Sequence, residues 1–211
     1  MEITWLGHAA FKIKTDNNLI IYFDPYELSK GEEKADIIVS THEHHDHFDP
    51  NSIKKILKED TVVIGPSSIS NKLKKFNGKG LDLYEPYEVK GVTIELIPSY
   101  NIKKPNHPKE KKWAGIILET GGKKVYHAGD TERIPEMKDL KEKGINVALL
   151  PCGGTYTMDF EESAMCAVDI KPDIVVPMHN WDKDLADYEM KVHEKDPNIK
   201  VEILKNKSLN I

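Results

Sequence analysis

The sequence predicts an α/β fold in which two mixed sheets lie beneath outer helices. The 211-residue chain runs from a set of strands into a mixed stretch of strands and helices, and then repeats that order. Its apolar segments are short and rich in β-branched residues, as in buried strands. Two sheets that pack together beneath helices bury both strand sets, and two similar halves bring their strand-end loops to a shared edge.

The first half begins with three short β-rich runs, at residues 2–6, 10–14 and 19–23. Gly7-His8 and Asp16-Asn17-Asn18 separate these runs, and such spacing is typical of an antiparallel meander. Strands and helices then alternate, with expected bounds of strand 35–39, helix 50–58, strand 61–65 and a helix from Pro66 to Phe76.

The second half repeats this order with a new set of strands. The expected strands cover 81–87, 92–97, 113–119 and 123–127, the last two joined by a turn at Gly121-Gly122. The mixed stretch that follows has helix 135–143, strand 146–150, helix 160–169 capped by Asp159, strand 174–177, helix 183–195 and strand 200–204. We found no sequence repeat that would prove a duplication.

Length and composition indicate one domain spanning residues 1–211. Hydrophobic residues make up 39% and charged residues 31% of the chain, and no apolar run approaches the roughly 20 residues of a membrane helix. The first residues lack the basic and apolar regions of a signal peptide, so we expect a cytoplasmic protein without a membrane partner. Cys152 and Cys166 are too far apart for a C-x-x-C zinc site. The net charge of −5 argues against a general nucleic-acid surface.

The strongest functional signal is the stretch from Ser40 to Asp49. It holds four of the nine histidines and three carboxylates, and it lies between the expected strand 35–39 and a helix that Asp49-Pro50 would begin. Imidazole and carboxylate groups suit zinc and similar divalent ions, and rigid flanking elements lower the entropy lost when ligands converge. This stretch is therefore predicted to bind metal.

Other potential ligands also follow the ends of expected strands. They are His8, the Ser99-Tyr100-Asn101 stretch, His127 with Asp130, and His179. Loops at sheet edges are where functional sites gather, and a carboxylate such as Asp130 has two oxygens that could serve two metals. Taken alone, Asp130 could equally be a helix cap, and His179 a core histidine.

The pattern H-x-H-x-D-H at His42, His44, Asp46 and His47, followed by Gly129-Asp130 and a late His179, resembles the metallo-β-lactamase superfamily. Within it, Trp5-Leu6-Gly7-His8-Ala9, Tyr126 to Thr131 and Val176 to His179 are similar to the UlaG-like metal-dependent hydrolases. The resemblance covers nearly the whole chain. It implies a four-layer αββα sandwich with a dinuclear metal site at one edge.

The resemblance also implies a role for each ligand. His42 and His44 would hold one metal, while Asp46, His47 and His179 would hold the other, and Asp130 would bridge them. The third histidine of the first metal is missing from its usual place, where this chain has Asn101, a poorer ligand than imidazole. Either His107 enters from the following loop, which we favour, or the first site is weak, water-completed or empty.

The implied activity is that of a metal-dependent hydrolase with two divalent ions, zinc first, with manganese, iron or nickel as alternatives. Asp46 would orient or deprotonate the attacking water, and His8 or His127 would either stabilise an oxyanion or support the ligands. Five lysines between Lys103 and Lys112 could attract an anionic substrate, which we expect to be a small ester, lactone or phosphodiester.

Three other functions remain open from the sequence. The fold also hosts nucleic-acid phosphodiesterases, against which the acidic charge balance argues. A metal-binding regulatory protein without turnover would fit the missing histidine. Diiron redox chemistry is disfavoured because His44 stands where diiron members of the superfamily have a glutamate. The sequence does not determine the substrate or the oligomeric state.

Overall fold

The strands form two sheets, which the computed structural model describes over residues 1–181, 183–205 and 207–211. In those ranges each sheet has seven strands. The N-terminal sheet has the order β14-β1-β2-β3-β4-β5-β6. Its strands are β1 (Glu2–Gly7), β2 (Ala10–Lys14), β3 (Ile20–Phe23), β4 (Ile37–Val39), β5 (Val62–Pro66), β6 (Lys79–Leu81) and β14 (Ser208–Asn210).

The C-terminal sheet has the order β13-β12-β11-β10-β9-β8-β7. Its strands are β7 (Tyr87–Val89), β8 (Val92–Pro98), β9 (Ala114–Thr120), β10 (Lys123–His127), β11 (Val147–Pro151), β12 (Ile174–Met178) and β13 (Lys200–Val201). Both sheets are mixed in the same way. Strands close in sequence pair antiparallel at one side, as in β1-β2-β3 and β7-β8-β9-β10, and parallel strands complete the other side.

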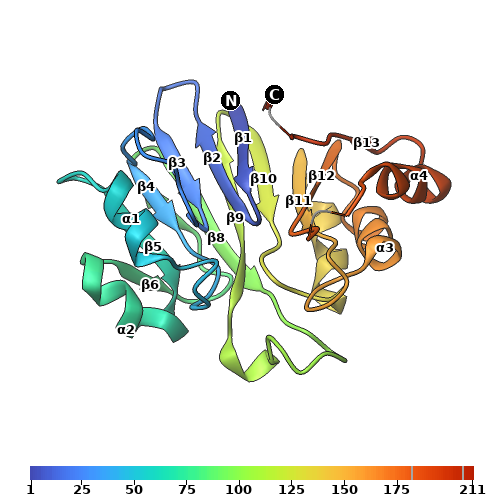
Figure 1. Cartoon of the computed structure of the whole chain (residues 1–211), viewed down its shortest axis with the longest axis horizontal. Coiled ribbons are helices and arrows are strands. Elements are labelled where there is room, and N and C mark those ends of the chain that lie inside the picture. Colours follow the sequence, from blue (N-terminus) through green and yellow to red (C-terminus); the bar gives the residue numbers. More distant parts are fainter. Residues whose placement is uncertain (182, 206) are drawn as a thin grey trace.

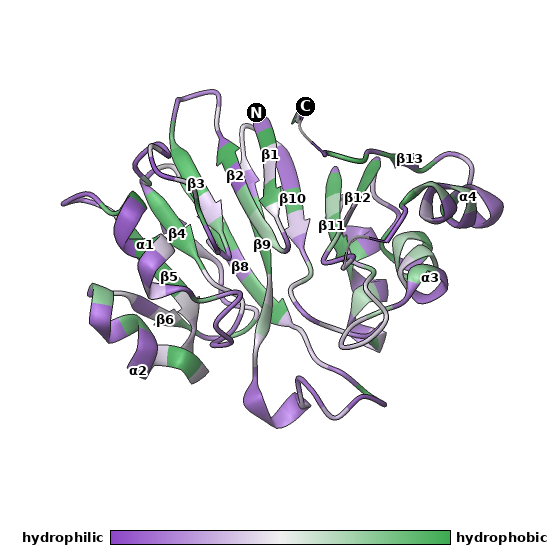
Figure 2. Ribbon diagram, viewed as in Figure 1, coloured by the Kyte–Doolittle hydropathy of each residue, from purple (hydrophilic) through white to green (hydrophobic). Residues whose placement is uncertain are grey.

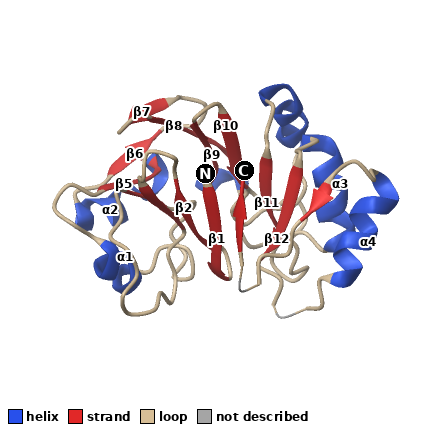
Figure 3. Ribbon diagram, turned by 90° about the horizontal axis from the view of Figure 1, so that it is seen from above, coloured by secondary structure: helices blue, strands red, loops and turns tan. Residues whose placement is uncertain are grey.

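The helices cover the outer faces of the two sheets. Helices α1 (Pro50–Ile56) and α2 (Ser70–Leu73) lie on the N-terminal sheet, and α3 (Phe160–Ile170) and α4 (Ala186–Lys195) lie on the C-terminal sheet (Figure 3). One apolar core fills the space between the sheets, and two others lie between each sheet and its helices. The strands β3, β4, β11 and β12 are apolar along most of their length, while the helices carry polar outer faces (Figure 2). This αββα arrangement confirms the predicted fold.

Most of the predicted elements are present, and the exceptions have physical reasons. The predicted strand 81–87 is wrong, since β6 ends at Leu81 and β7 begins at Tyr87 in the other sheet. Pro86, which has no N–H to donate, interrupts the run between them. The helix expected from Pro66 is divided into η1 (Ser67–Ile69), α2 and η2 (Lys74–Phe76), and the helix expected at 135–143 is the 3₁₀ helix η4 (Pro135–Lys143).

The terminal strand was missed. β14 pairs with β1 through only three residues, which is too short to give a pattern. Of the helices in the described ranges, none is long and apolar enough to cross a membrane.

Candidate metal centre

Six strands deliver the candidate residues to one edge of the sandwich. In the N-terminal sheet β1, β3 and β4 run the same way, and in the C-terminal sheet β8, β10 and β12 do. The residues that follow their carboxyl ends therefore meet at the sheet edges. Backbone hydrogen bonds join the two edges, from His179 N to His8 O at 3.0 Å and from Ala114 N to Thr41 O at 3.1 Å. The long loop between β8 and β9, light green in Figure 1, projects at this edge.

The first group of ligand atoms belongs to His42, His44 and His107, which lie within 4.8 Å of one another. His42 Nε2 is 3.0 Å from His44 Nδ1. His107 reaches them from the loop between β8 and β9, where it has a positive φ of 61°. The structure thus brings His107 beside the two loop histidines that lacked a third partner. Trp113 packs against this group, with its ring centroid 4.9 Å from that of His42.

The second group comprises His8, Asp46, His47 and His179, whose ligand atoms also lie within 4.8 Å of one another. His8 Nε2 is 3.0 Å from Asp46 Oδ2, and the His8 and His179 rings are 3.9 Å apart between centroids. A ring nitrogen of His8 is therefore part of this second group of potential ligand atoms. The side chains of His47 and His179 are almost completely buried, whereas Asp46 and His8 retain some exposure.

Asp130 lies between the two groups. Its Oδ1 is 3.3 Å from His47 Nε2, and its Oδ2 is 3.2 Å from both His107 Nε2 and His179 Nε2. A left-handed turn at Gly129, with φ of 64°, presents this carboxylate after β10. A Cβ on Gly129 would lie 3.1 Å from the Thr41 side chain, so glycine also allows the close approach of the two loops.

The unpaired polar atoms of this centre fit metal ions. Asp130 Oδ1 and the Nε2 atoms of His47, His107 and His179 are buried, and none makes a well-aligned hydrogen bond within the described ranges. Buried polar groups normally have partners, and a group of such atoms facing one another needs an explanation. Imidazole nitrogens converging on a carboxylate form the donor set of zinc and related ions. We conclude that the residues present fit the group that the sequence predicts.

Asp24 supports the first loop, and the sequence prediction missed it. It follows β3, is fully buried, and accepts hydrogen bonds from Thr41 N at 2.7 Å and from His47 Nδ1 at 2.6 Å. Thr41 Oγ1 also donates to Asp24 at 2.7 Å and lies 2.9 Å from His42 Nδ1. A carboxylate that fixes the outer nitrogen of a histidine leaves the inner nitrogen free for a metal. Its position after a strand was the available signal, but Asp24-Pro25 was taken only as the end of that strand.

His127 and Asn101 have supporting positions instead. His127 is fully buried with both ring nitrogens used, since Nε2 donates to Ala9 O at 2.8 Å and Nδ1 accepts from Gly129 N at 3.1 Å. It therefore fixes the turn before Asp130 and does not face the centre. Asn101 is buried, and its Nδ2 donates to Tyr156 O at 2.7 Å and lies 3.2 Å from His107 Nδ1.

Burial and charge pull the ionisable groups of the centre in opposite directions. Burial would raise the pKa of Asp130, but the charges of His47 and His179 hold it well below its usual value. For His47, burial lowers the pKa, yet the carboxylates of Asp130 and Asp24 raise it well above the usual value. The pKa of His42 is lowered well below its usual value by burial and then by His47. Burial would raise the pKa of Asp46, but the hydrogen bond with His8 and the charge of His47 lower it.

A cavity of about 350 Å³ opens onto this centre. It is lined by several of the candidate metal ligands and also by Asn106, Tyr156 and Trp181. His45, whose side chain is 85% exposed, lines it as well. Among its described lining residues there is no lysine or arginine. Three of the five loop lysines lie near carboxylates, with Lys104 near Glu132, Lys109 near Glu136 and Lys111 near Glu43.

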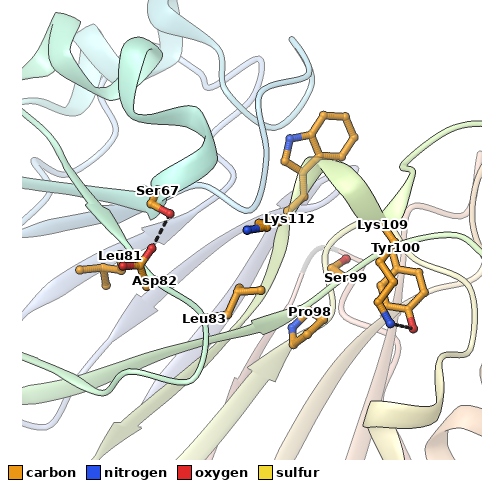
Figure 4. A pocket seen from close by; sticks show the side chains of 10 residues that line it. Ser67, Leu81, Asp82, Leu83, Pro98, Ser99, Tyr100, Lys109 and Lys112 are labelled. Atoms are coloured by element: carbon orange, nitrogen blue, oxygen red, sulfur yellow. Dashed lines mark hydrogen bonds between the residues drawn. The ribbon is translucent and has the colours of Figure 1, made fainter.

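A second, larger cavity of about 480 Å³ has Trp113 in its lining. Figure 4 shows this cavity from close by. Ser67 and Asp82 form a 2.6 Å hydrogen bond on one side, and Lys109 and Tyr100 form one of 3.0 Å on the other. Leu81, Leu83 and Pro98 supply apolar walls. This cavity contains none of the candidate metal ligands, so Trp113 separates it from the centre.

Comparison with known proteins supports the same conclusion. Residues 2–179 match the family model described as the beta-lactamase superfamily domain. A protein of Nanoarchaeum equitans named UPF0173 metal-dependent hydrolase is 36% identical over 218 residues, which cover 97% of this chain and 96% of that protein. One of the same name from Thermus thermophilus is 32% identical over 189 residues, covering 85% and 83%. The structure of a metallo hydrolase from Ignicoccus hospitalis has a TM-score of 0.84 and 29% identity, covering 100% of this chain and 98% of that one.

Proposed function

The chain belongs to the beta-lactamase superfamily, as a metal-dependent hydrolase, and we propose that it uses two divalent ions to cleave a small anionic substrate. One ion is held by His42, His44 and His107, and the other by Asp46, His47 and His179, with His8 beside them. Zinc suits this donor set best, and manganese, iron and nickel are the alternatives. The substrate is an ester, lactone or phosphodiester.

The position of Asp130 carries this proposal. One buried carboxylate lies 3.2 to 3.3 Å from the Nε2 atoms of three histidines that come from three different loops. Protonating these imidazoles would not by itself give their Nε2 atoms a well-aligned hydrogen-bond acceptor in the described part of the chain. Cations held between the carboxylate and the rings would satisfy these atoms, because a carboxylate offers two oxygens as ligands.

Bound at this centre, the ions would supply hydroxide at neutral pH, because they lower the pKa of water to about 7, and would polarise the scissile group. Asp46 Oδ2 accepts a hydrogen bond from His8 Nε2, which orients the carboxylate, and its partial exposure lets it hold or accept a proton from water. While a neutral His8 donates to Asp46, it has no second N–H to donate to the substrate, so its role is to support Asp46.

An anionic group would be attracted by the ions, not by the loop lysines, three of which are near carboxylates. The cavity of about 350 Å³ has the volume of a small-molecule pocket, at the lower end of the usual range. This volume, together with the net charge of −5, favours small-molecule hydrolysis over nuclease activity.

Elemental analysis of the untreated protein, paired with hydrolysis of an ester, lactone and phosphodiester panel, tests this function. We expect about two divalent ions per chain and turnover that Asp46→Ala lowers at least about a hundredfold, or about 2.7 kcal/mol of barrier. Glu43→Ala is the matched control, because it removes a carboxylate from the same loop whose partner is Lys111 at 3.7 Å.

Unchanged turnover in a folded Asp46→Ala protein would contradict the proposed role of Asp46. Metal without hydrolysis of any class in the panel would instead favour a regulatory metal-binding protein.

A further inference from the structure

Two large aromatic side chains are exposed at the mouth of the metal centre. Trp181 is 50% exposed and Tyr156 is 42% exposed, and both line the cavity of about 350 Å³. Their ring centroids are 6.0 Å apart, with planes inclined at 64°. Exposed aromatic groups that lie together at a pocket mouth cost free energy in water unless a partner covers them.

The backbone around Trp181 is arranged to place its indole there. Trp181 has a φ of 49°, in the left-handed region that non-glycine residues rarely occupy. A Cβ on Gly153 would lie 2.5 Å from the indole Cδ1 and 2.9 Å from Nε1, so the ring rests directly on that glycine. The ring also lies edge-on to the imidazoles of His8 and His179, with centroids 5.3 and 5.2 Å away. Such placement of a half-exposed ring beside two candidate ligands calls for a functional reason.

The backbone of Tyr156 is attached to the other end of the centre. Its backbone oxygen accepts from Asn101 Nδ2 at 2.7 Å, and the same amide lies 3.2 Å from His107 Nδ1. Trp181 is thus attached to the His179 side of the centre and Tyr156 to the His107 side. The two aromatic rings lie next to each other, edge to face, in the wall of the cavity.

We propose that Trp181 and Tyr156 form a subsite for a planar aromatic group, carried by the substrate on the ester, lactone or phosphodiester that the centre cleaves. This inference rests on the proposed function. An aromatic ring packed against the exposed faces of this pair would cover apolar surface of both side chains and add offset or edge-to-face contacts. Among the described residues that line the cavity there is no lysine or arginine. The anionic end of the substrate therefore faces the ions, and its aromatic ring faces outward.

Binding of two phosphonates to the metal-loaded protein tests the subsite. Phenylphosphonate and methylphosphonate share one anionic group and differ by the ring, and calorimetry gives the ratio of their dissociation constants. We expect wild-type protein to prefer phenylphosphonate about tenfold, which corresponds to about 1.4 kcal/mol. Trp181→Ala should reduce that ratio at least about fivefold while methylphosphonate binding stays the same, and Trp181→Phe should retain most of it.

Tyr84→Ala is the matched control, since Tyr84 is a 55% exposed aromatic residue with φ of 67° that lies outside the lining of the cavity. Its ratio should equal that of wild type. Equal ratios of the two dissociation constants in wild type and Trp181→Ala would overturn the subsite and leave the proposed function standing. The same conclusion would follow if Trp181→Ala weakened the binding of both phosphonates equally. Failure of either phosphonate to bind to metal-loaded wild-type protein would count against the anionic substrate and the subsite together.

Discussion

The two sheets contribute to the metal centre in different ways. The N-terminal sheet supplies His42, His44, Asp46 and His47 from a single loop after β4, and His8 after β1 lies beside them. The C-terminal sheet supplies its three candidate ligands one at a time, as His107 after β8, Asp130 after β10 and His179 after β12. One half is a local motif, and the other exists only when three strands have been assembled.

The two halves also differ in what fixes their histidines. In the N-terminal half, Asp24 accepts a hydrogen bond from His47 Nδ1, and Thr41 Oγ1 lies 2.9 Å from His42 Nδ1. In the C-terminal half, His107 Nδ1 faces the amide nitrogen of Asn101, and His179 Nδ1 has no partner among the residues that the structure describes. We infer that the N-terminal half is preorganised for metal and that the C-terminal half depends more on the ions for its order.

Removing the carboxylate that joins the halves should have the largest effect. Asp130→Ala takes away the group that contacts His47, His107 and His179, and it leaves their Nε2 atoms facing one another. We expect the protein to bind fewer than two ions and to lose at least about a thousandfold in kcat/KM, or about 4 kcal/mol. Elemental analysis and steady-state kinetics measure both.

Asp139→Ala, at an exposed position of η4, should behave as wild type. If Asp130→Ala retains two ions at wild-type affinity, the two halves do not share this carboxylate.

The difference between the halves also decides what the sequence could predict. The spacing of His42 to His47 is local, and Asp130 and His179 could be found because each directly follows an expected strand. His107 is farther from a strand end, and its approach depends on the path of an irregular loop. The partnership of Asp24 with His47 depends on parallel pairing of β3 with β4, which no local pattern encodes. Likewise, the subsite needs Gly153 and Trp181 to meet from separate loops.

His107→Ala should separate the two candidate sites. If His107 is the third ligand beside His42 and His44, its removal should weaken one of the two ions about a hundredfold, or about 2.7 kcal/mol, and leave the other in place. Competition with a chelator would then show two release steps in the variant. His193→Ala removes an exposed histidine from α4 and should leave both affinities unchanged. Unchanged metal stoichiometry, affinity and activity in His107→Ala would rule out His107 as the missing ligand.

Asp24→Asn should give a smaller effect that is confined to the preorganised half. The carboxylate accepts hydrogen bonds from Thr41 Oγ1 and His47 Nδ1, whereas an amide nitrogen at the same place can only donate one. His47 would then carry its proton on Nε2, which lies 3.3 Å from Asp130 Oδ1, and a protonated Nε2 cannot bind metal. We expect a 10- to 100-fold loss of metal affinity, roughly 1.4 to 2.7 kcal/mol, because removing a group that holds a metal ligand in place has effects of that size.

Asp16→Asn, at an exposed carboxylate that pairs with the N-terminus, controls for charge. Circular dichroism would show whether the fold is retained. In a folded Asp24→Asn protein, unchanged affinity would mean that the N-terminal half gains no preorganisation from Asp24. The contrast between the two halves would then lie in the order of their ligands along the chain and not in how rigidly they are held.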